Sequence, residues 1–418
     1  MINKKILVTG GNRLNGKIRV QTSKNSILPI MAGALLNSGV SILKNIPNLL
    51  DIDNMVKLIE GLGVKVEKGE DLVIDATKID KITIDAELSK SLRSSIFLLG
   101  PMLARCKKVV ISYPGGCDIG NRPIDLHLLG LKELGVKIDE RHSLIRCDGS
   151  KMRANTVQLD FASVGATENL MMASVFLKGE TKIINAAREP EIVDLQDFLN
   201  SMGAKISGAG TSEITIQGVN SLHDTTFKPI VDRIVAGTYL IATAMCGGKI
   251  EINNISPVYL QSLITKLKSS GCDICCGKDF IKLSSNGELV GINVINTSVY
   301  PGFPTDLQAQ IMAMETIASG VSVVIENIFE NRFKHAYEFI KMGADIYIKD
   351  RVAIIRGVKE LKGAPVSASD LRGGASLVLA GLKATGYTTI TNIQHILRGY
   401  EDIVRDLSSL GADIKYID

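Results

Sequence analysis

Two short stretches, KMGADI at residues 341–346 and SLGADI at residues 409–414, share a glycine followed by a small apolar residue, a charged residue and a further apolar residue. The same pattern returns four more times along the chain, always at an interval of 68 or 72 residues. Its six glycines are Gly63, Gly135, Gly203, Gly271, Gly343 and Gly411. A near-constant period over six copies is typical of a chain built from one repeated structural unit.

Each copy predicts the same order of elements around this pattern. An apolar helix is followed by a strand, then by a second helix that ends at the repeat glycine, then by another strand. We expect that glycine to cap the second helix in a left-handed conformation. The first helices are apolar nearly all round, which favours their burial. They are predicted at residues 25–37, 94–104, 165–177, 233–246, 306–318 and 372–384.

The six units, of about 70 residues each, predict an α/β chain of two domains with three βαβαβ units per domain, buried helices inside and sheets outside. The segment 222–232 is polar and contains a proline, so we expect one domain over residues 22–229. Residues 1–21 plus 230–418 then form a discontinuous second domain. Its opening strands, KKILVTGG and KIRVQT, are expected to complete the sixth unit, which leaves two connecting strands side by side between the domains.

Composition indicates a globular protein without low-complexity segments. The chain has 418 residues, 45% of them apolar and 22% charged, and its net charge of +4 is too small to predict nucleic-acid binding but suits an anionic small molecule. Neither a signal peptide nor a transmembrane helix is predicted, because the apolar runs are too short. Seven scattered cysteines fit reduced thiols, so we expect a cytoplasmic protein.

The predicted starts of the six buried helices are polar. Free N–H groups and the positive end of the helix dipole attract anions at such a position. Capping is the alternative interpretation, and it would explain Ser23, Ser163 and Thr305. Capping does not explain cations, which are unfavourable at a helix start unless an anion joins them. The cations at these starts are Lys24, Arg93, Arg233 and Arg372, and they favour an anion-binding site.

The stretch YPGGCDIGNRPIDLH at residues 113–127 places Cys117 among glycines, with Arg122 five residues further on. A thiol that merely fills a core would have apolar neighbours. A free thiol has a pKa of about 8.5, which falls beside cations, so a cysteine in this setting can serve as an acid or a nucleophile. The glycines give the loop freedom to move. The pattern predicts a reactive thiol, and an unused loop cysteine is the alternative.

Ten motifs appear in order along nearly the whole chain: TSKNSILP, SLRSSIFLLGP, GGCDIGNRPIDLH, SVGATENLMMA, AAREPEIVD, DRIVAGTYL, FPTDLQAQ, ENRFKH, DLRGGASLVLAG and HILRGYE. Together they resemble the UDP-N-acetylglucosamine (UDP-GlcNAc) enolpyruvyl transferase family. The resemblance implies a two-domain inside-out α/β barrel that closes on its substrates in the cleft between the domains. It also implies transfer of the enolpyruvyl group of phosphoenolpyruvate to the 3′-hydroxyl of UDP-GlcNAc, with release of phosphate, as the first committed step of peptidoglycan precursor synthesis.

The resemblance assigns the reacting groups. Cys117 is implied as the general acid, and it can also attack phosphoenolpyruvate or be alkylated by the epoxide fosfomycin. Lys24, Arg122 and Arg398 are implied as cations that bind phosphoenolpyruvate. Asp306 matches the family's candidate base for the 3′-hydroxyl. A helix start stabilises a carboxylate as the anion, so Asp306 either removes the proton or chiefly orients the hydroxyl.

The resemblance also implies the residues that hold the substrates. They are Lys24, Asn25, Arg93, Arg122, Pro123, Ile124, Asp125, Leu126, Ser163, Val164, Gly165, Asp306 and Ile328. Glu189, Arg332 and Arg372 are expected to support the cleft, although each could equally form a structural ion pair. The expected partners are phosphoenolpyruvate and UDP-GlcNAc, with no cofactor, metal, nucleic acid or membrane. The oligomeric state stays open.

Other patterns are weaker. The stretch VTGGNRLNG at residues 8–16 resembles a dinucleotide fingerprint, but a strand rather than a helix follows, so a hairpin turn is expected. Cys272, Cys275 and Cys276 resemble half of a metal site, but no second pair exists, and Cys272 aligns with alanines of other units, which predicts a small buried position. Two alternative functions remain: the shikimate-pathway enzyme that shares the architecture, and a non-catalytic nucleotide-sugar sensor.

Overall fold

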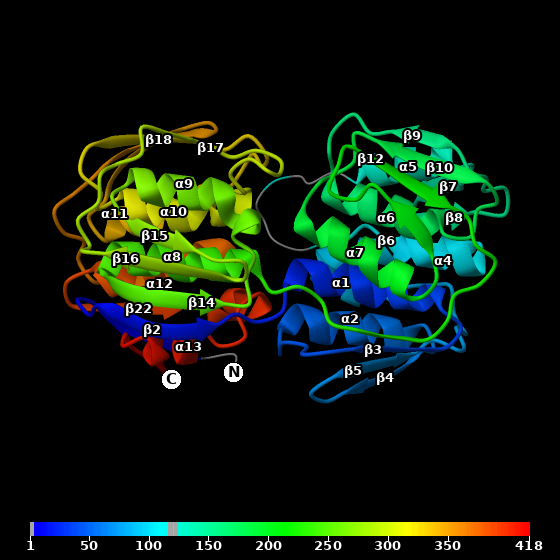
Figure 1. The fold of residues 1–418 in the computed structure, drawn as a ribbon, viewed down its shortest axis with the longest axis horizontal. Coiled ribbons are helices and arrows are strands. Elements are labelled where there is room, and N and C mark those ends of the chain that lie inside the picture. Colours follow the sequence, from blue (N-terminus) through cyan, green and yellow to red (C-terminus); the bar gives the residue numbers. More distant parts are fainter. Residues whose placement is uncertain (1–3, 116–119, 121–123) are drawn as a thin grey trace. The chain divides into compact units, whose positions relative to one another are not determined.

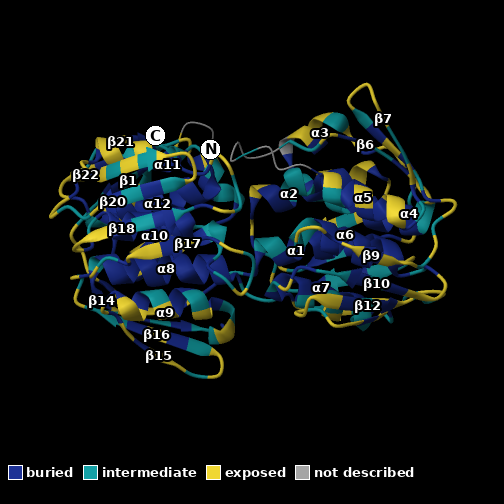
Figure 2. Ribbon diagram, turned by 90° about the horizontal axis from the view of Figure 1, so that it is seen from above, coloured by how far each residue is buried: buried dark blue, intermediate teal, exposed yellow. Residues whose placement is uncertain are grey.

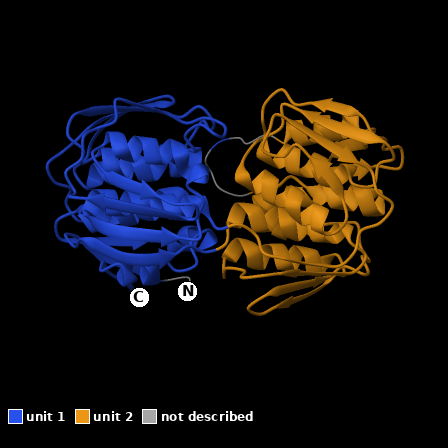
Figure 3. Ribbon diagram, in the orientation of Figure 1, with its two compact units in different colours: residues 1–21, 117–122, 231–418 blue, residues 22–116, 123–230 orange. Residues whose placement is uncertain are grey.

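The computed structural model describes residues 4–115, 120 and 124–418, which form two compact units (Figures 1 and 3). Unit 1 consists mainly of residues 4–21 and 231–418. Unit 2 consists of residues 22–115 and 124–230. Each unit is described by itself below. None of the helices in the described part of the chain has the length and apolar character needed to cross a bilayer.

Unit 1 has three inner helices, α8 (Arg233–Cys246), α10 (Gln308–Glu315) and α12 (Leu371–Lys383). Nearly every residue of these helices is buried, because sheets cover their outer sides (Figure 2). One sheet has the order β21 (Pro365–Ser367), β22 (Tyr387–Thr391), β1 (Lys5–Thr9), β23 (Asp413–Ile417). The second has the order β15 (Asp273–Cys276), β16 (Phe280–Ser285), β14 (Gly248–Asn253), β2 (Leu14–Arg19). The third has the order β17 (Val294–Asn296), β18 (Val321–Ile325), β20 (Val352–Arg356), β19 (Asp345–Lys349).

Unit 2 repeats this arrangement with inner helices α1 (Lys24–Gly33), α4 (Leu99–Cys106) and α6 (Val164–Ser174). Its first sheet has the order β13 (Thr225–Phe227), β3 (Val40–Leu43), β5 (Leu72–Asp75), β4 (Lys65–Lys68). The second has the order β11 (Lys205–Ser207), β12 (Glu213–Gln217), β10 (Glu180–Ile184), β9 (Thr156–Gln158). The third has the order β6 (Lys108–Ser112), β8 (Leu144–Asp148), β7 (Lys137–Arg141).

A second set of helices lies nearer the surface, and each is followed by a repeat glycine. These helices are α2 (Leu50–Gly61), α5 (Asp125–Glu133), α7 (Pro190–Ser201), α9 (Gln261–Ser269), α11 (Lys334–Lys341) and α13 (Ile403–Ser409). All six repeat glycines have φ between 93° and 100°. This conformation is costly for a residue with a Cβ, so the predicted left-handed cap is confirmed. Cys272 is also buried like Ala204, Ala344 and Ala412, as the alignment of the units predicted.

The first two strands differ from the prediction. β1 pairs with β22 and β23, as expected, but β2 pairs in parallel with β14 in a different sheet. The stretch at residues 8–16 is therefore not a hairpin turn. Its backbone bonds to neighbouring segments instead: Gly11 N–H donates to Leu382 and Leu14 N–H donates to Gly247. A local turn motif does not reveal such partners, because they lie far away in the sequence.

The inner helices begin close to the predicted positions, but three of them include short 3₁₀ segments. In unit 2, η1 (Ala34–Leu36) follows α1 and η2 (Arg93–Leu98) precedes α4. In unit 1, η4 (Thr305–Leu307) precedes α10. The remaining short helices are α3 (Ala86–Ser91), η3 (Pro257–Leu260) and η5 (Ile393–Arg398).

The segment 222–232 is more ordered than its composition indicates, because it contains β13 paired with β3. Beyond β13, the N–H of Ser23 donates to the carbonyl of Ile230 at 2.8 Å within unit 2. Within unit 1, the N–H of Asp232 donates to the carbonyl of Gln21, also at 2.8 Å. The two connecting strands are therefore hydrogen-bonded side by side, as expected.

Candidate active site

Asp306 in unit 1 lies between two arginines. Arg332 donates through Nη2 to Oδ1 of Asp306 at 2.8 Å, and Arg372 donates through Nη2 to Oδ2 at 3.2 Å. The two arginine side chains are only 4% and 3% exposed, whereas that of Asp306 is 28% exposed. Buried arginines thus hold an accessible carboxylate from both sides. Arg332 and Arg372 form ion pairs with Asp306, which was the alternative interpretation, and their support of a substrate site stays a prediction.

Arg372 lies at the start of α12, where a cation needs a nearby negative charge. Burial acts to lower its pKa, but the charge of Asp306, together with Tyr400 and Asp232, raises the pKa overall. The side chain of Asp370 caps the same helix by accepting from the N–H groups of Arg372 and Gly373. At Arg372 the chain therefore supplies an anion itself, and an external anion at this helix start stays a prediction.

Arg398 is the last residue of η5 and is half-buried. Burial lowers the pKa of the nearby His395, and the charge of Arg398 lowers it further. Tyr400, two residues after Arg398, is fully buried and its hydroxyl lies 2.8 Å from Oγ1 of Thr238 in α8. Its ring also lies 5.6 Å from the guanidinium carbon of Arg372. Tyr400 thus ties the segment carrying Arg398 to the inner helices.

Ile328 lies in the turn that follows β18, and a buried carboxylate holds this turn. The backbone N–H groups of Ile328 and Phe329 donate to Oε1 of Glu326 at 2.9 and 3.1 Å. The other oxygen, Oε2, accepts from the hydroxyl of Thr305 at 2.9 Å. Glu326 therefore anchors both the turn of Ile328, an expected sugar contact, and Thr305, the residue before Asp306.

Lys24 is the first residue of α1 in unit 2. Its Nζ lies 3.2 Å from Oδ2 of Asp51, which belongs to the first turn of α2, and the two side chains are 12% and 3% exposed. As at Arg372, the anion that accompanies the cation is a carboxylate of the chain. The pair still leaves a cation at a helix start, where an anionic substrate can compete for it.

Beside Lys24 and Asn25, Ser26 is fully buried, and its hydroxyl donates to Oδ2 of Asp194. The same oxygen accepts from the N–H of Ile230 at 3.1 Å. Burial raises the pKa of Asp194 to about 6, although both hydrogen bonds oppose the rise. The start of α1 is therefore fixed to α7 and to the connecting strand at Ile230.

The start of α6 packs on a histidine. A Cβ placed on Gly165 would lie 2.9 Å from Cε1 and 3.1 Å from Nε2 of His127, so glycine allows this close approach. Nδ1 of His127 lies 2.8 Å from Nδ2 of Asn169. The amide orientation follows from the backbone, because Oδ1 accepts from Gly100 N–H and Nδ2 donates to the carbonyl of Ile96. Nδ1 of His127 therefore accepts, and a neutral ring carries its proton on Nε2.

The other expected nucleotide-sugar residues of unit 2 also lie at helix starts. Ile124 is buried immediately before α5, Asp125 is its first residue and exposed, and Leu126 is half-buried. Arg93 begins η2. Ser163 and Val164 lie at the start of α6 beside Gly165.

Three site residues expected from the sequence, Cys117, Arg122 and Pro123, lie outside the described residues. Burial disfavours the reactive thiolate form of several thiols inside the described part. Burial raises the pKa of Cys147 and of Cys246 to about 12, and that of Cys272 to about 11. Cys275 and Cys276 are exposed on β15.

The capping interpretation is confirmed at one position and wrong at two. Ser163 accepts from the N–H of Ala166 at 3.4 Å, as a cap should. Ser23 makes no side-chain cap to α1. Thr305 accepts from Nη1 of Arg332 at 2.7 Å and donates to Glu326, so its hydroxyl belongs to the Asp306 cluster. Sequence shows which residues can cap a helix but not which other partner their hydroxyl has found.

Several acids beneath the helix starts were not predicted. Glu168 on α6 is fully buried, and burial, followed by the charges of Glu191 and Glu189, raises its pKa. Asp51 and Glu326 lie in none of the quoted motifs, whereas Asp194 ends AAREPEIVD and Glu168 lies in SVGATENLMMA. Neither motif by itself shows that its acid is buried beneath a helix start.

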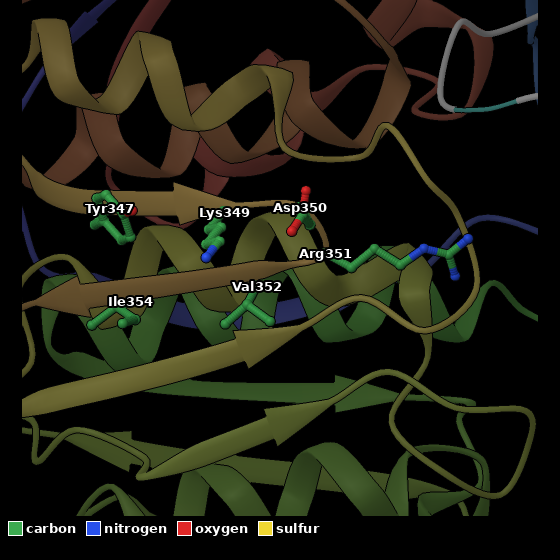
Figure 4. A pocket seen from close by; sticks show the side chains of 6 residues that line it. All are labelled: Tyr347, Lys349, Asp350, Arg351, Val352 and Ile354. Atoms are coloured by element: carbon green, nitrogen blue, oxygen red, sulfur yellow. The ribbon is translucent and has the colours of Figure 1, made fainter.

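A shallow hollow of about 550 Å³ lies on the outer side of unit 1 over β19 and β20. Its lining residues are Tyr347, Lys349, Asp350, Arg351, Val352 and Ile354 (Figure 4). None of these is an expected site residue. Arg351 points from the hollow to the turn after β18, where it contacts Glu330 at 3.1 Å. The hollow is a surface feature, whereas the expected site residues of unit 1 cluster at Asp306.

Comparison with known proteins identifies the family. The model of the EPSP synthase (3-phosphoshikimate 1-carboxyvinyltransferase) family matches residues 8–407. UDP-N-acetylglucosamine 1-carboxyvinyltransferase 2 of Caldanaerobacter subterraneus subsp. tengcongensis is 53% identical over 411 residues, which cover 98% of this chain and 99% of that protein. UDP-N-acetylglucosamine 1-carboxyvinyltransferase 1 of Carboxydothermus hydrogenoformans is 46% identical over 413 residues, with 99% and 98% covered. The chain belongs to the UDP-N-acetylglucosamine 1-carboxyvinyltransferase family.

The fold agrees with this family. The crystal structure of the enolpyruvyl transferase NikO from Streptomyces tendae matches with a TM-score of 0.88 at 24% identity, covering 100% of this chain and 99% of that one. The resemblance read from the motifs is thus confirmed, and the chain is a transferase of this family with the mixed α/β fold of enolpyruvyl transferases.

Proposed function

We propose that this chain transfers the enolpyruvyl group of phosphoenolpyruvate to the 3′-hydroxyl of UDP-GlcNAc and releases phosphate, as the first committed step of peptidoglycan precursor synthesis. The observation that carries the proposal is the full-length identity with relatives named for this transfer. The Asp306 cluster supports it, because an accessible carboxylate held by two buried arginines suits a hydroxyl donor. We place the reaction in the cytoplasm.

The architecture behind the proposal has six copies of one βαβαβ unit, three in each domain, arranged with helices inside and sheets outside. Six sheets and six repeat glycines of left-handed conformation support this division. We take the domains as residues 22–229 and residues 1–21 plus 230–418.

In the proposed reaction, a proton from Cys117 adds to C3 of phosphoenolpyruvate while the 3′-oxygen of UDP-GlcNAc bonds to C2. The hydroxyl proton passes to the Asp306 carboxylate or to solvent beside it, and a tetrahedral adduct results. Return of a C3 proton to the Cys117 thiolate then expels phosphate from C2 and restores the double bond, so atoms and charges balance. Lys24, Arg122 and Arg398 neutralise the phosphate and carboxylate of phosphoenolpyruvate.

Asp306 acts on the 3′-hydroxyl in this scheme. The nucleotide-sugar is held by Asn25, Arg93, Arg122, Pro123, Ile124, Asp125, Leu126, Ser163, Val164, Gly165 and Ile328. Helix starts supply N–H donors for its diphosphate, and the start of α6 is the best-defined of them because Gly165 packs directly against the ring of His127.

The test is phosphate release from phosphoenolpyruvate by the purified chain, with UDP-GlcNAc or shikimate 3-phosphate as the acceptor. We expect phosphate release only when UDP-GlcNAc is the acceptor. Release with shikimate 3-phosphate would favour the sister enzyme of the shikimate pathway. Tight binding of UDP-GlcNAc in calorimetry without any phosphate release would favour a sensor.

A further inference from the structure

We propose that Glu326 is a positioning residue that sets Asp306 and the turn carrying Ile328 in a fixed relation, and so aligns the acceptor sugar. This inference rests on the proposed function, in which Asp306 and Ile328 contact UDP-GlcNAc. Glu326 lies outside the motifs that carry the family resemblance, and it follows β18 directly. All the contacts concerned lie within unit 1.

Glu326 is fully buried, and its two oxygens are used for different tasks. Oε1 accepts from the N–H groups of Ile328 and Phe329 and from the hydroxyl of Thr297, at 2.9, 3.1 and 2.9 Å. These bonds fix the turn after β18 to β17, whose last residue is Asn296. Oε2 accepts from the hydroxyl of Thr305 at 2.9 Å. A buried carboxylate with several donors is the strong form of such an anchor.

Thr305 links Glu326 to Asp306 through Arg332. Its hydroxyl gives its only proton to Glu326, so its oxygen must act as an acceptor toward Nη1 of Arg332, which lies 2.7 Å away. The same guanidinium donates through Nη2 to Asp306 at 2.8 Å. The orientation of Arg332 against Asp306 therefore depends on the proton that Thr305 donates to Glu326.

The position is unusual for the chain. In four other sheets, the residue before the aligned asparagine is Lys44, Ile184, Asn253 or Thr391, each only half-buried and none a carboxylate. Those four asparagines have positive φ, whereas Asn327 does not, so the turn after β18 differs from theirs. An acid at this single place is explained by the two groups that it joins.

The variant Glu326→Gln keeps the shape of the side chain but replaces one hydrogen-bond-accepting oxygen by an amide NH₂, which donates. The amide oxygen is expected to face the backbone N–H groups, which leaves the NH₂ facing Thr305 and deprives the hydroxyl proton of its acceptor. We expect kcat/KM for UDP-GlcNAc to fall roughly 10-fold to 100-fold, with KM for UDP-GlcNAc raised and KM for phosphoenolpyruvate nearly unchanged. Calorimetry should show weaker UDP-GlcNAc binding in the absence of turnover.

Glu315→Gln is the matched control. Glu315 is a buried carboxyl in the same unit that accepts from Ser322 Oγ at 2.5 Å and from the N–H of Ile292 at 2.9 Å, but it lies at the far end of α10 from Asp306. We expect its kinetic constants to stay within about two-fold of wild type. A purely structural role for Glu326 would make both variants alike.

Thr305→Val tests the same link with Glu326 intact, and it serves if Glu326→Gln fails to fold. We expect the double variant to be no worse than the poorer single variant, because both changes break one chain of contacts. Additive losses, or a Glu326→Gln enzyme that behaves like Glu315→Gln, would overturn the inference. A wild-type chain without phosphate release would instead refute the proposed function, and calorimetry of UDP-GlcNAc binding would still decide the role of Glu326.

Discussion

Removing the Lys24 side chain should have two separable effects, because the structure gives this residue a structural partner as well as an expected catalytic task. Lys24 and Asp51 form an ion pair at 3.2 Å with side chains 12% and 3% exposed. Breaking a buried pair by removing one partner typically costs 3–5 kcal/mol, because the other charge stays buried. Lys24→Ala should therefore destabilise unit 2 by about 3 kcal/mol, or roughly 6–12 °C in Tm. The expectation from sequence alone would have been an unaffected fold.

The catalytic effect can be isolated by removing both charges. In the double variant Lys24→Met with Asp51→Asn, no unpaired charge remains, so most of the lost stability should return. Turnover should not return, because phosphoenolpyruvate still lacks one of its three proposed cations, and we expect kcat to stay at least about 100-fold below wild type. Thermal unfolding and phosphate release, measured on wild type, both single variants and the double variant, decide between the roles. Restored turnover in the double variant would refute a direct role for Lys24.

Three further predictions concern single residues. Cys117 should be the cysteine that fosfomycin alkylates rapidly, and UDP-GlcNAc should speed the labelling. The variant Cys117→Asp should resist the drug yet retain some turnover. Equal labelling of Cys275 in peptide mass mapping would contradict this prediction. Burial raises the pKa of Glu315 from 4.5 to about 7, so the stability present below about pH 4.5 is lost as the pH rises through about 7. Glu315→Gln should remove that loss, which amounts to about 3 kcal/mol of unfolding free energy. Urea unfolding of both proteins near pH 5 and pH 8 tests this, because the wild type should lose stability between the two pH values and the variant should not. Gly165→Ala should weaken UDP-GlcNAc binding in calorimetry and cost about 1–3 kcal/mol of stability, since its Cβ would lie 2.9 Å from His127; unchanged affinity would mean that the start of α6 does not bind the ligand.

The helix ends could be predicted from the sequence, and the pairing of the short edge strands could not. Six glycines at regular intervals predicted six helix ends, and their φ angles agree. β2 pairs in parallel with β14 just as β9, β13, β17 and β21 pair with the strands beside them, but a strand this short carries no periodic signal of its partner. β13 was hidden for the same reason, since its partner β3 lies far earlier in the chain.

At the site, sequence located charged residues but not their partners. The rule that a cation at a helix start needs an anion holds at Lys24 and Arg372, yet in both cases the chain supplies a carboxylate, Asp51 or Asp306. Asp51 and Glu326 lie in other segments, and only the folded chain brings them to the helix starts. The same electrostatic rule therefore located cations that need an anion, while the binding of an anionic substrate at these helix starts stays a prediction.

The geometry around Asp306 bears on whether this residue removes a proton or orients a hydroxyl. Arg332 and Arg372 contact its two oxygens separately, so both oxygens already accept a hydrogen bond from a guanidinium. A carboxylate held in this way is fixed in place and is a well-placed acceptor of one further hydrogen bond. We therefore expect Asp306 chiefly to orient the 3′-hydroxyl, with its proton leaving late, as the bond from oxygen to carbon forms. Under this interpretation, Asp306→Asn, which keeps an acceptor oxygen, should retain more UDP-GlcNAc affinity than turnover, whereas Asp306→Ala should lose both.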